Sequence, residues 1–199
     1  MDTAGLLALS GFVFAATMSP GPNNIMVMAS GATFGFRRSI PHLLGISGGI
    51  LAIVVFAGLG LAAVFDVFPI LETVLIVVSA VYLLWLAWKI ATAAPPVTGD
   101  TQARPLSLFQ AAAFQWVNPK AWVTGLSAIA IFAPSHSLAC VVLVGSSFAT
   151  LGLVSSAIWT WMGTALRRWL IVGHRLRIFN LAMATLLVAS LYPLIFNSD

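Results

Sequence analysis

The chain has 199 residues, of which 60% are hydrophobic and only 7% are charged. A soluble domain carries about a quarter charged residues, so this composition excludes a water-soluble globular protein and indicates an integral membrane protein. The net charge of +4 does not indicate nucleic-acid binding, because the basic residues lie at the ends of apolar stretches, as membrane topology requires.

Six apolar stretches approach the length of about 20 residues that a membrane-spanning helix needs. In chain order they cover residues 5–32, 42–64, 69–91, 107–132, 137–163 and 178–196. We therefore expect an all-α integral membrane protein with six transmembrane helices in one domain over 1–199. A turn-rich linker at 93–106 would separate a first repeat, 1–92, from a second, 107–199.

The first stretch is interrupted in its middle by the segment Ser19-Pro20-Gly21-Pro22-Asn23-Asn24. A proline cannot continue a helix, because it lacks the backbone donor and its ring clashes with the preceding turn. In hydrocarbon, the backbone groups that such a break frees need partners in the protein or in a wet cavity. The segment predicts either a tightly packed kink or a polar binding site.

Small residues in the second and fifth stretches indicate close contacts between helices. Gly45 and Gly49 form a GxxxG pattern in the second stretch. The fifth stretch contains Gly145, Ser146, Ser147, Gly152, Ser155 and Ser156. We interpret these residues as packing positions rather than ligand contacts. The same GxxxG pattern leaves a homo-oligomer open.

The fourth stretch contains a second break, Asn118-Pro119-Lys120. Lys120 comes about 13 residues into the stretch, roughly 20 Å from its inner end at 1.5 Å per residue. A lysine near the bilayer centre is costly, and it marks a functional site by default. The alternative is that Lys120 binds a carbonyl freed by Pro119 and only stabilises the kink.

The two breaks occupy corresponding places, since each begins one half of the chain. Three helices per half is an odd number, so the second repeat would have inverted topology relative to the first. Interrupted helices at matching places in two inverted repeats indicate the central site of a transporter.

The groups around the breaks suit a zwitterionic amino acid. The N-termini of the half-helices that follow the breaks favour a carboxylate, as does Lys120, and free carbonyls can accept hydrogen bonds from an ammonium group. Tyr82 and Gln115 add hydrogen-bonding groups. The predicted substrate-binding residues are Pro20, Gly21, Pro22, Asn23, Asn24, Tyr82, Gln115, Asn118, Pro119 and Lys120.

Other polar residues indicate no further chemistry. His42, His136 and His174 fall at the ends of stretches, where interfacial positions are expected, and they lack the spacing of a metal site. The single Cys140 excludes an internal disulfide and a cysteine zinc cluster. Trp159 and other tryptophans near the inner side fit an aromatic belt. We expect no cofactor and no metal.

The basic residues predict the orientation. Eight of the nine lie in or beside the loops 33–41, 92–106 and 164–177. By the positive-inside rule these loops face the cytoplasm, so both termini should face outward.

The two broken motifs, together with Gly35-Phe36-Arg37 and the overall length, resemble the LysE/RhtB superfamily of bacterial amino-acid exporters. The stretches 82–92 and 103–107 are most similar to the cysteine/O-acetylserine exporter branch. The resemblance implies efflux of small neutral amino acids across the cytoplasmic membrane, driven by the proton-motive force. The expected partners are an amino-acid substrate, the lipid bilayer and protons.

Several alternatives stay open at this point. Related branches export threonine, homoserine, leucine or basic amino acids, although no acid lies deep in a stretch to pair with a cationic side chain or to relay protons. A non-transporting assembly subunit is a second alternative. A membrane-embedded serine hydrolase is disfavoured because the histidines lie at the ends of the stretches.

Overall fold

The structure is a computed structural model that describes the chain except for residues 61–62, 69, 93–103, 136, 171–173 and 193–199. All regular secondary structure in the described part is helical, in agreement with the predicted all-α class. The helices are α1 (Thr3–Met18), α2 (Pro22–Phe34), α3 (Phe36–Gly58), α4 (Val64–Val67), α5 (Ile70–Ala91), α6 (Leu108–Trp116), α7 (Pro119–Phe132), α8 (Leu138–Leu170) and α9 (Arg175–Ala189).

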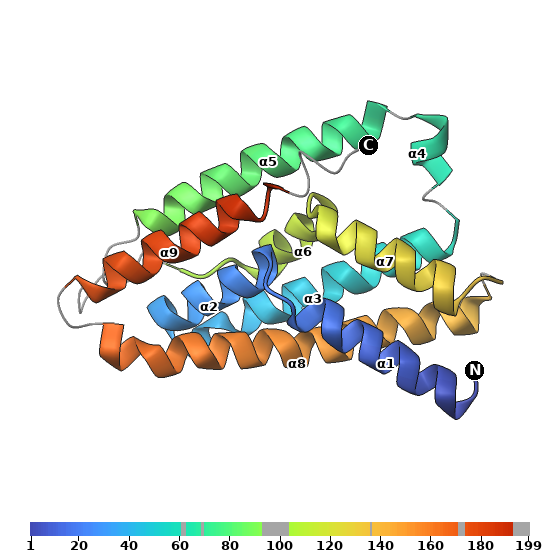
Figure 1. Cartoon of the computed structure of the whole chain (residues 1–199), viewed down its shortest axis with the longest axis horizontal. Helices are drawn as coiled ribbons and strands as arrows, with labels where there is room; N and C mark the ends of the chain where they lie inside the picture. Colours follow the sequence, from blue (N-terminus) through green and yellow to red (C-terminus); the bar gives the residue numbers. More distant parts are fainter. Residues whose placement is uncertain (61–62, 69, 93–103, 136, 171–173, 193–199) are drawn as a thin grey trace.

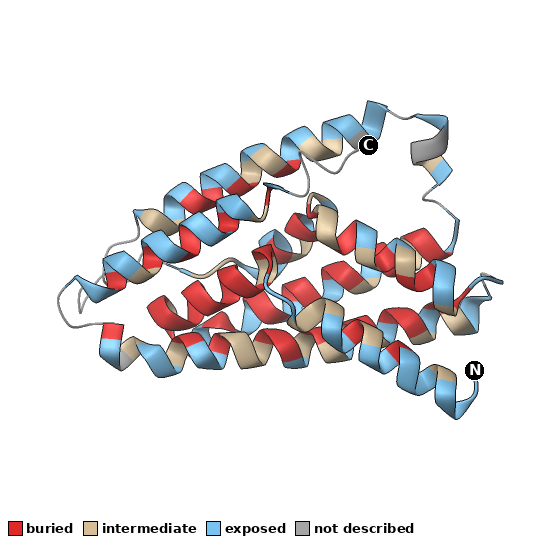
Figure 2. Ribbon diagram, viewed as in Figure 1, coloured by how far each residue is buried: buried red, intermediate tan, exposed pale blue. Residues whose placement is uncertain are grey.

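Two antiparallel helix pairs organise the bundle. α3 packs against α8, and α5 packs against α9, with the two members of each pair running in opposite directions (Figure 1). α2 lies between them, in contact with α3, α8 and α9, so nearly all of its residues are buried. Figure 2 shows buried residues concentrated in α2 and α3, whereas α5 and α9 present exposed faces. Many of those exposed residues are large and apolar, as a lipid-facing surface requires.

Part of the predicted membrane topology is seen directly. Among the described residues, α3, Thr73–Ala91 of α5 and Leu138–Arg167 of α8 are long and apolar enough to cross a membrane. The α1–α2 pair qualifies as a fourth, broken span, bent by 59°. α7 is apolar but has only 14 residues. The arrangement of six spans in two repeats therefore stays a prediction. Most of the predicted linker, and the end of the sixth predicted span, lie outside the described residues.

Two of the predicted loops are wrong in their boundaries. The expected loop 33–41 is reduced to Gly35, whose φ of 82° is a left-handed conformation that suits glycine. α3 begins directly after it. α8 continues to Leu170, past the expected end of the fifth stretch at residue 163. Because α3 starts early, His42 lies within the first two turns of this helix, where it is buried among the other helices and only 2% exposed.

Glycines bring the helices next to the two breaks into backbone contact. A Cβ at Gly45 would lie 2.2 Å from the carbonyl oxygen of Leu108, so α3 and α6 could not approach as they do with a larger residue there. At Gly163 of α8, a Cβ would lie 2.0 Å from the carbonyl oxygen of Met28 in α2. The predicted packing role of Gly45 is thus confirmed, and α2 and α6 are fixed against α8 and α3.

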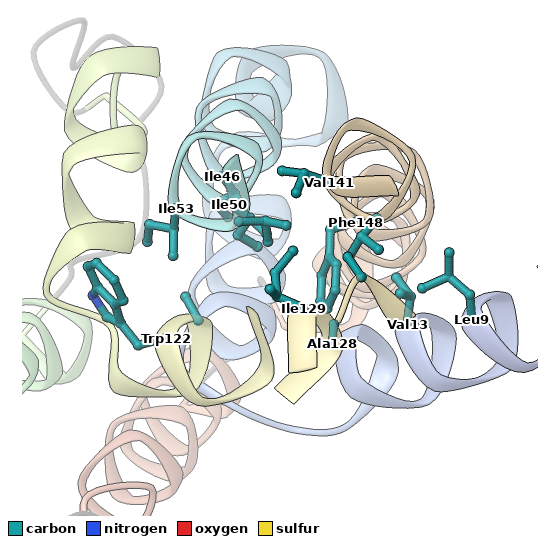
Figure 3. Close-up of a cluster of buried hydrophobic side chains, with 14 of the residues drawn as sticks. Leu9, Val13, Ile46, Ile50, Ile53, Trp122, Ala128, Ile129, Val141 and Phe148 are labelled. Carbon is teal, nitrogen blue, oxygen red and sulfur yellow. The ribbon is translucent and has the colours of Figure 1, made fainter. Parts of the chain in front are cut away.

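A buried apolar cluster connects α1, α3, α7 and α8 and forms one wall of the region around the breaks. Figure 3 shows its side chains directed toward one another from these four helices. The labelled members are Leu9, Val13, Ile46, Ile50, Ile53, Trp122, Ala128, Ile129, Val141 and Phe148. This packing positions α1 and α7, the two half-helices on the side of the breaks where the N-terminus lies (Figure 1), against the long helices.

Candidate functional site

The first break separates α1 from α2 at residues Ser19, Pro20 and Gly21. Pro22 is the first residue of α2, where its missing N–H costs no hydrogen bond. In the described structure no side chain caps this N-terminus. The break therefore lies where the sequence predicted it, and it leaves the amide groups of the first turn of α2 available.

Side chains from elsewhere satisfy the carbonyls at the end of α1. The Asn24 amide donates to the carbonyls of Thr17 and Ser19, at 2.7 and 2.9 Å. From α8, the Ser155 hydroxyl donates to the Thr17 carbonyl at 2.8 Å, and the Trp159 indole donates to that of Met18 at 3.3 Å. Trp159 is thus partly buried and takes part in the first break. These hydrogen bonds satisfy the carbonyl groups that the break exposes, so the break needs no water to be stable.

The second break is built in the same way. Pro119 is the first residue of α7, Asn118 is its N-cap residue, and the described side chains again provide no cap. The Ser79 hydroxyl of α5 donates to the carbonyl of Val117. The Trp122 indole donates to the carbonyl of Trp116 at 3.0 Å. Both predicted breaks are therefore present, each with a proline at the start of the second half-helix.

Lys120 connects the two breaks. Its ammonium group donates to the Ser19 carbonyl oxygen at 3.0 Å and to the Ser19 hydroxyl at 2.7 Å. A Cβ at Gly21 would lie 3.0 Å from Nζ, so a glycine there makes room for the lysine. The carbonyl that Lys120 binds belongs to the first break, and not to the second as the kink-stabilising alternative supposed.

A network of amide side chains forms a second connection. Asn23 and Gln115 exchange two hydrogen bonds, at 2.9 and 3.0 Å, although they are far apart in sequence. Gln115 also accepts from the Asn118 amide nitrogen at 3.3 Å. Asn118 is only 1% exposed, and its Oδ1 atom has no hydrogen-bond partner within the described structure. One acceptor of the network is therefore buried and unused.

A partly open cavity lies between the breaks, with about 460 Å³ of empty space that includes its opening. Five of the predicted binding residues line it: Gly21, Asn23, Asn24, Asn118 and Lys120. Of the described residues that line this cavity, none is an aspartate or glutamate.

The other predicted residues lie outside the cavity wall. Gln115 lies behind it and holds Asn23 and Asn118, while Pro20, Pro22 and Pro119 shape the breaks. Tyr82 belongs to a different region: its ring stacks on Phe114 with centroids 5.1 Å apart and packs in the apolar cluster between α5 and α9. The structure does not bring Tyr82 to the cavity.

Sequence reasoning missed a second set of lining residues. They come from α1, α3, α7 and α8, and they are Ala16, Thr17, Ile46, Ile50, Ala121, Thr124, Phe148, Gly152 and Ser156. Gly152 and Ser156 were interpreted as packing positions. Their spacing of four residues, which places both on one helix face, was the available signal.

The chain matches the model of the LysE type translocator family over residues 14–191. The chain belongs to this family. It is 34% identical to the cysteine/O-acetylserine efflux proteins of Escherichia coli (strain K12) and Shigella sonnei (strain Ss046), over 89% of this chain and 90% of each relative. No solved structure matches it significantly. As a LysE type translocator, the protein is a transporter and not an enzyme, which confirms the resemblance seen in its two broken motifs.

Proposed function

We propose that the protein is a secondary exporter of small neutral amino acids in the bacterial cytoplasmic membrane, with cysteine and O-acetylserine as the substrates that its relatives' names indicate. The observation that carries this proposal is that Lys120 and Asn118, whose amide oxygen has no partner among the described groups, both line one cavity between the two helix breaks. These groups match the two charged ends of an amino acid.

The substrate carboxylate binds on the side of Lys120. The ammonium group of Lys120 and the uncapped N-termini of α2 and α7 all carry positive charge or partial charge. Among the described residues, the Lys120 ammonium group donates only to neutral oxygens, both of Ser19. A carboxylate forms stronger, charge-assisted hydrogen bonds with an ammonium group than a neutral oxygen does.

The substrate ammonium binds on the side of Asn118. Its Oδ1 atom is a buried acceptor without a donor among the described groups, and leaving such an atom unsatisfied costs about 1–3 kcal/mol. The Asn118 nitrogen is engaged with Gln115, which directs the oxygen toward the role of acceptor. A bound ammonium group satisfies it.

The charge of the cavity favours an uncharged side chain. The described lining contains a lysine and no carboxylate, so a cationic side chain would lie near a like charge without a counterion. This supports neutral amino acids over basic ones. Threonine, homoserine and leucine are neutral alternatives that a transport assay separates.

The fold supports two inverted repeats. The broken pair α1–α2 would correspond to α6–α7, α3 to α8, and α5 to α9. The members of the last two pairs pack against each other in opposite directions (Figure 1), as elements related by an axis in the membrane plane do. Rocking of one repeat against the other would then open the central cavity to each side in turn.

The decisive assay uses purified protein in liposomes preloaded with labelled cysteine, O-acetylserine, threonine, leucine or arginine, with and without a pH gradient. We expect release of cysteine and O-acetylserine, accelerated by the gradient, and no release of arginine. Absence of release for every amino acid would contradict the proposal and favour an assembly subunit. Release at the same rate with and without the pH gradient would contradict only the proton coupling.

A companion variant, Asn118→Ala, tests the ammonium site. We expect roughly a 10- to 100-fold rise in KM for every exported amino acid, because a hydrogen bond to a charged group contributes about 1.5–3 kcal/mol. The thermal unfolding midpoint in detergent should fall only slightly, since the lost oxygen has no partner in the described structure and the lost nitrogen makes one long hydrogen bond, to Gln115 at 3.3 Å. An unchanged KM would show that Asn118 does not bind the substrate.

A further inference from the structure

One hydroxyl group in the cavity wall makes no hydrogen bond with the described part of the protein. Three hydroxyl side chains, those of Thr17, Thr124 and Ser156, line the cavity. Thr17 donates to the Val13 carbonyl at 2.8 Å, and Thr124 donates to the Lys120 carbonyl at 2.7 Å. The Ser156 hydroxyl makes no hydrogen bond with any described residue, although the residue is only 3% exposed.

A free hydroxyl is unusual at such a depth. Serine and threonine hydroxyls inside helices commonly donate a hydrogen bond to a backbone carbonyl of the preceding turn. In α8, Ser147 donates to the carbonyl of Leu143, and Thr160 donates to that of Ser156. Buried polar groups are nearly always hydrogen-bonded. The Ser156 hydroxyl is not among the fully buried, unpartnered atoms of the described structure; it reaches the cavity that the residue lines, and is therefore available to a partner that enters the cavity.

The surroundings of Ser156 limit what that partner is. Ile46, Ile50 and Phe148 form the apolar part of the lining, and Figure 3 shows these side chains directed into the same interior from α3 and α8. One turn before Ser156, Gly152 has no side chain, and a Cβ there would meet only Thr17 Cγ2, at 3.6 Å. The space next to Gly152 is thus open, on the same face of α8 as Ser156 and Phe148.

We infer that Ser156 is a specificity-determining residue that hydrogen-bonds the polar atom of the substrate's own side chain. This inference rests on the proposed function and deepens it. The substrate class is a small neutral amino acid with one hydrogen-bonding group close to its α-carbon: a hydroxyl, a thiol or an ester oxygen. A serine hydroxyl suits all three because it can both donate and accept.

The apolar walls and the hydroxyl act together in selection. An aliphatic side chain of equal size fits the same space but leaves the Ser156 hydroxyl unsatisfied. The net value of one such hydrogen bond corresponds to roughly a three- to tenfold difference in affinity. A charged side chain would lose its hydration against Ile46, Ile50 and Phe148 without a counterion.

The test compares two ligands of equal size, serine and 2-aminobutyrate, which differ by a hydroxyl in place of a methyl group. Binding to the detergent-purified full chain is measured by calorimetry, and each ligand is also tested as an inhibitor of cysteine release from liposomes. The wild-type protein should bind serine about three- to tenfold more tightly. Ser156→Ala should abolish that preference by weakening serine binding and leaving 2-aminobutyrate binding unchanged.

Two further variants separate specificity from structure. Ser156→Thr retains the hydroxyl and should retain the preference for serine. Ser146→Ala, on the exposed side of α8, removes a hydroxyl that bonds only to the Leu143 carbonyl and should leave both affinities unchanged. The inference would be overturned if Ser156→Ala still preferred serine, or if it lost affinity for serine and for 2-aminobutyrate equally. Failure of the wild-type protein to bind any amino acid would overturn the proposed function as well.

Discussion

At the scale of single residues, the two breaks differ from ordinary kinks in how their polar groups are used. The carbonyls freed at the first break receive donors from α2, α7 and α8, and those at the second receive donors from α5 and α7. Structural stability therefore does not require a ligand. Two residues of the cavity lining keep unused polar groups: the oxygen of Asn118 has no partner among the described groups, and the hydroxyl of Ser156 makes no hydrogen bond with a described residue.

Lys120 takes part in both the structure and the cavity, and a pair of variants separates the two roles. Lys120→Met retains the length and the apolar stem but removes the charge. Export should fall about 10- to 100-fold, since a charge-assisted hydrogen bond to the carboxylate contributes about 1.5–3 kcal/mol. Initial rates of cysteine release from liposomes measure this loss.

Ser19→Ala is the matched control, because it removes only the hydroxyl that Lys120 contacts at 2.7 Å and leaves the Ser19 carbonyl in place. We expect its export rate to stay within about threefold of the wild type, as is common for one neutral hydrogen bond. If Ser19→Ala is as inactive as Lys120→Met, the lysine serves mainly to hold the first break, and the carboxylate role is wrong.

At the scale of the elements, two helix–helix contacts, each with two glycines, hold the half-helices in place. α6 meets α3 at Gly45 and Gly49, and α2 meets α8 at Gly31 and Gly163. Without a strong hydrophobic driving force between helices in lipid, close van der Waals contact is a main source of association. These contacts fix the positions of α2 and α6 and therefore the geometry of both breaks.

Two glycines of the same helix allow a controlled test of this packing. A Cβ at Gly45 would lie 2.2 Å from the Leu108 carbonyl oxygen, whereas one at Gly48 would meet nothing within 4 Å. Gly45→Ala should cost about 1–3 kcal/mol by overpacking, which lowers the unfolding midpoint by roughly 3–10 °C. Gly48→Ala should leave it unchanged or raise it slightly, because alanine favours the helix. Equal midpoints for the two variants would contradict a close α3–α6 contact.

At the scale of the whole molecule, positive charge gathers at one end of the bundle. Arg37 and Arg38 begin α3, where α2 ends, and Arg175 and Arg177 begin α9, after the end of α8. Cation–π contacts hold Lys89 over Trp85 and Arg175 over Trp169 near the same end. The N-terminus lies at the other end (Figure 1). The positive-inside rule then predicts a cytoplasmic basic end and an outward N-terminus.

Cysteine labelling in intact cells tests this orientation. In a Cys140→Ser background, Ser135→Cys lies in the exposed connection between α7 and α8, and Thr92→Cys lies exposed after the end of α5. A membrane-impermeant maleimide should label position 135 in intact cells and position 92 only after permeabilisation. The reverse pattern would place both termini in the cytoplasm.

The sequence by itself determined the properties that depend on local chemistry. Composition established a membrane protein, and the prolines established both helix breaks, because the loss of a backbone donor acts on the nearest turn whatever surrounds it. Five of the ten predicted binding residues line the cavity for the same reason: they belong to the breaks or directly follow them.

Only the tertiary structure decided which distant groups meet. Lys120 binds Ser19 across 101 positions, and Gln115 binds Asn23 across 92, pairings that no local pattern encodes. Tyr82 stacks on Phe114 and does not line the cavity, His42 lies buried inside α3, and Ser156 lines the cavity. A small or polar residue in an apolar helix has the same local pattern whether it faces a neighbouring helix or a cavity, since the packing of the other helices determines which of these it meets.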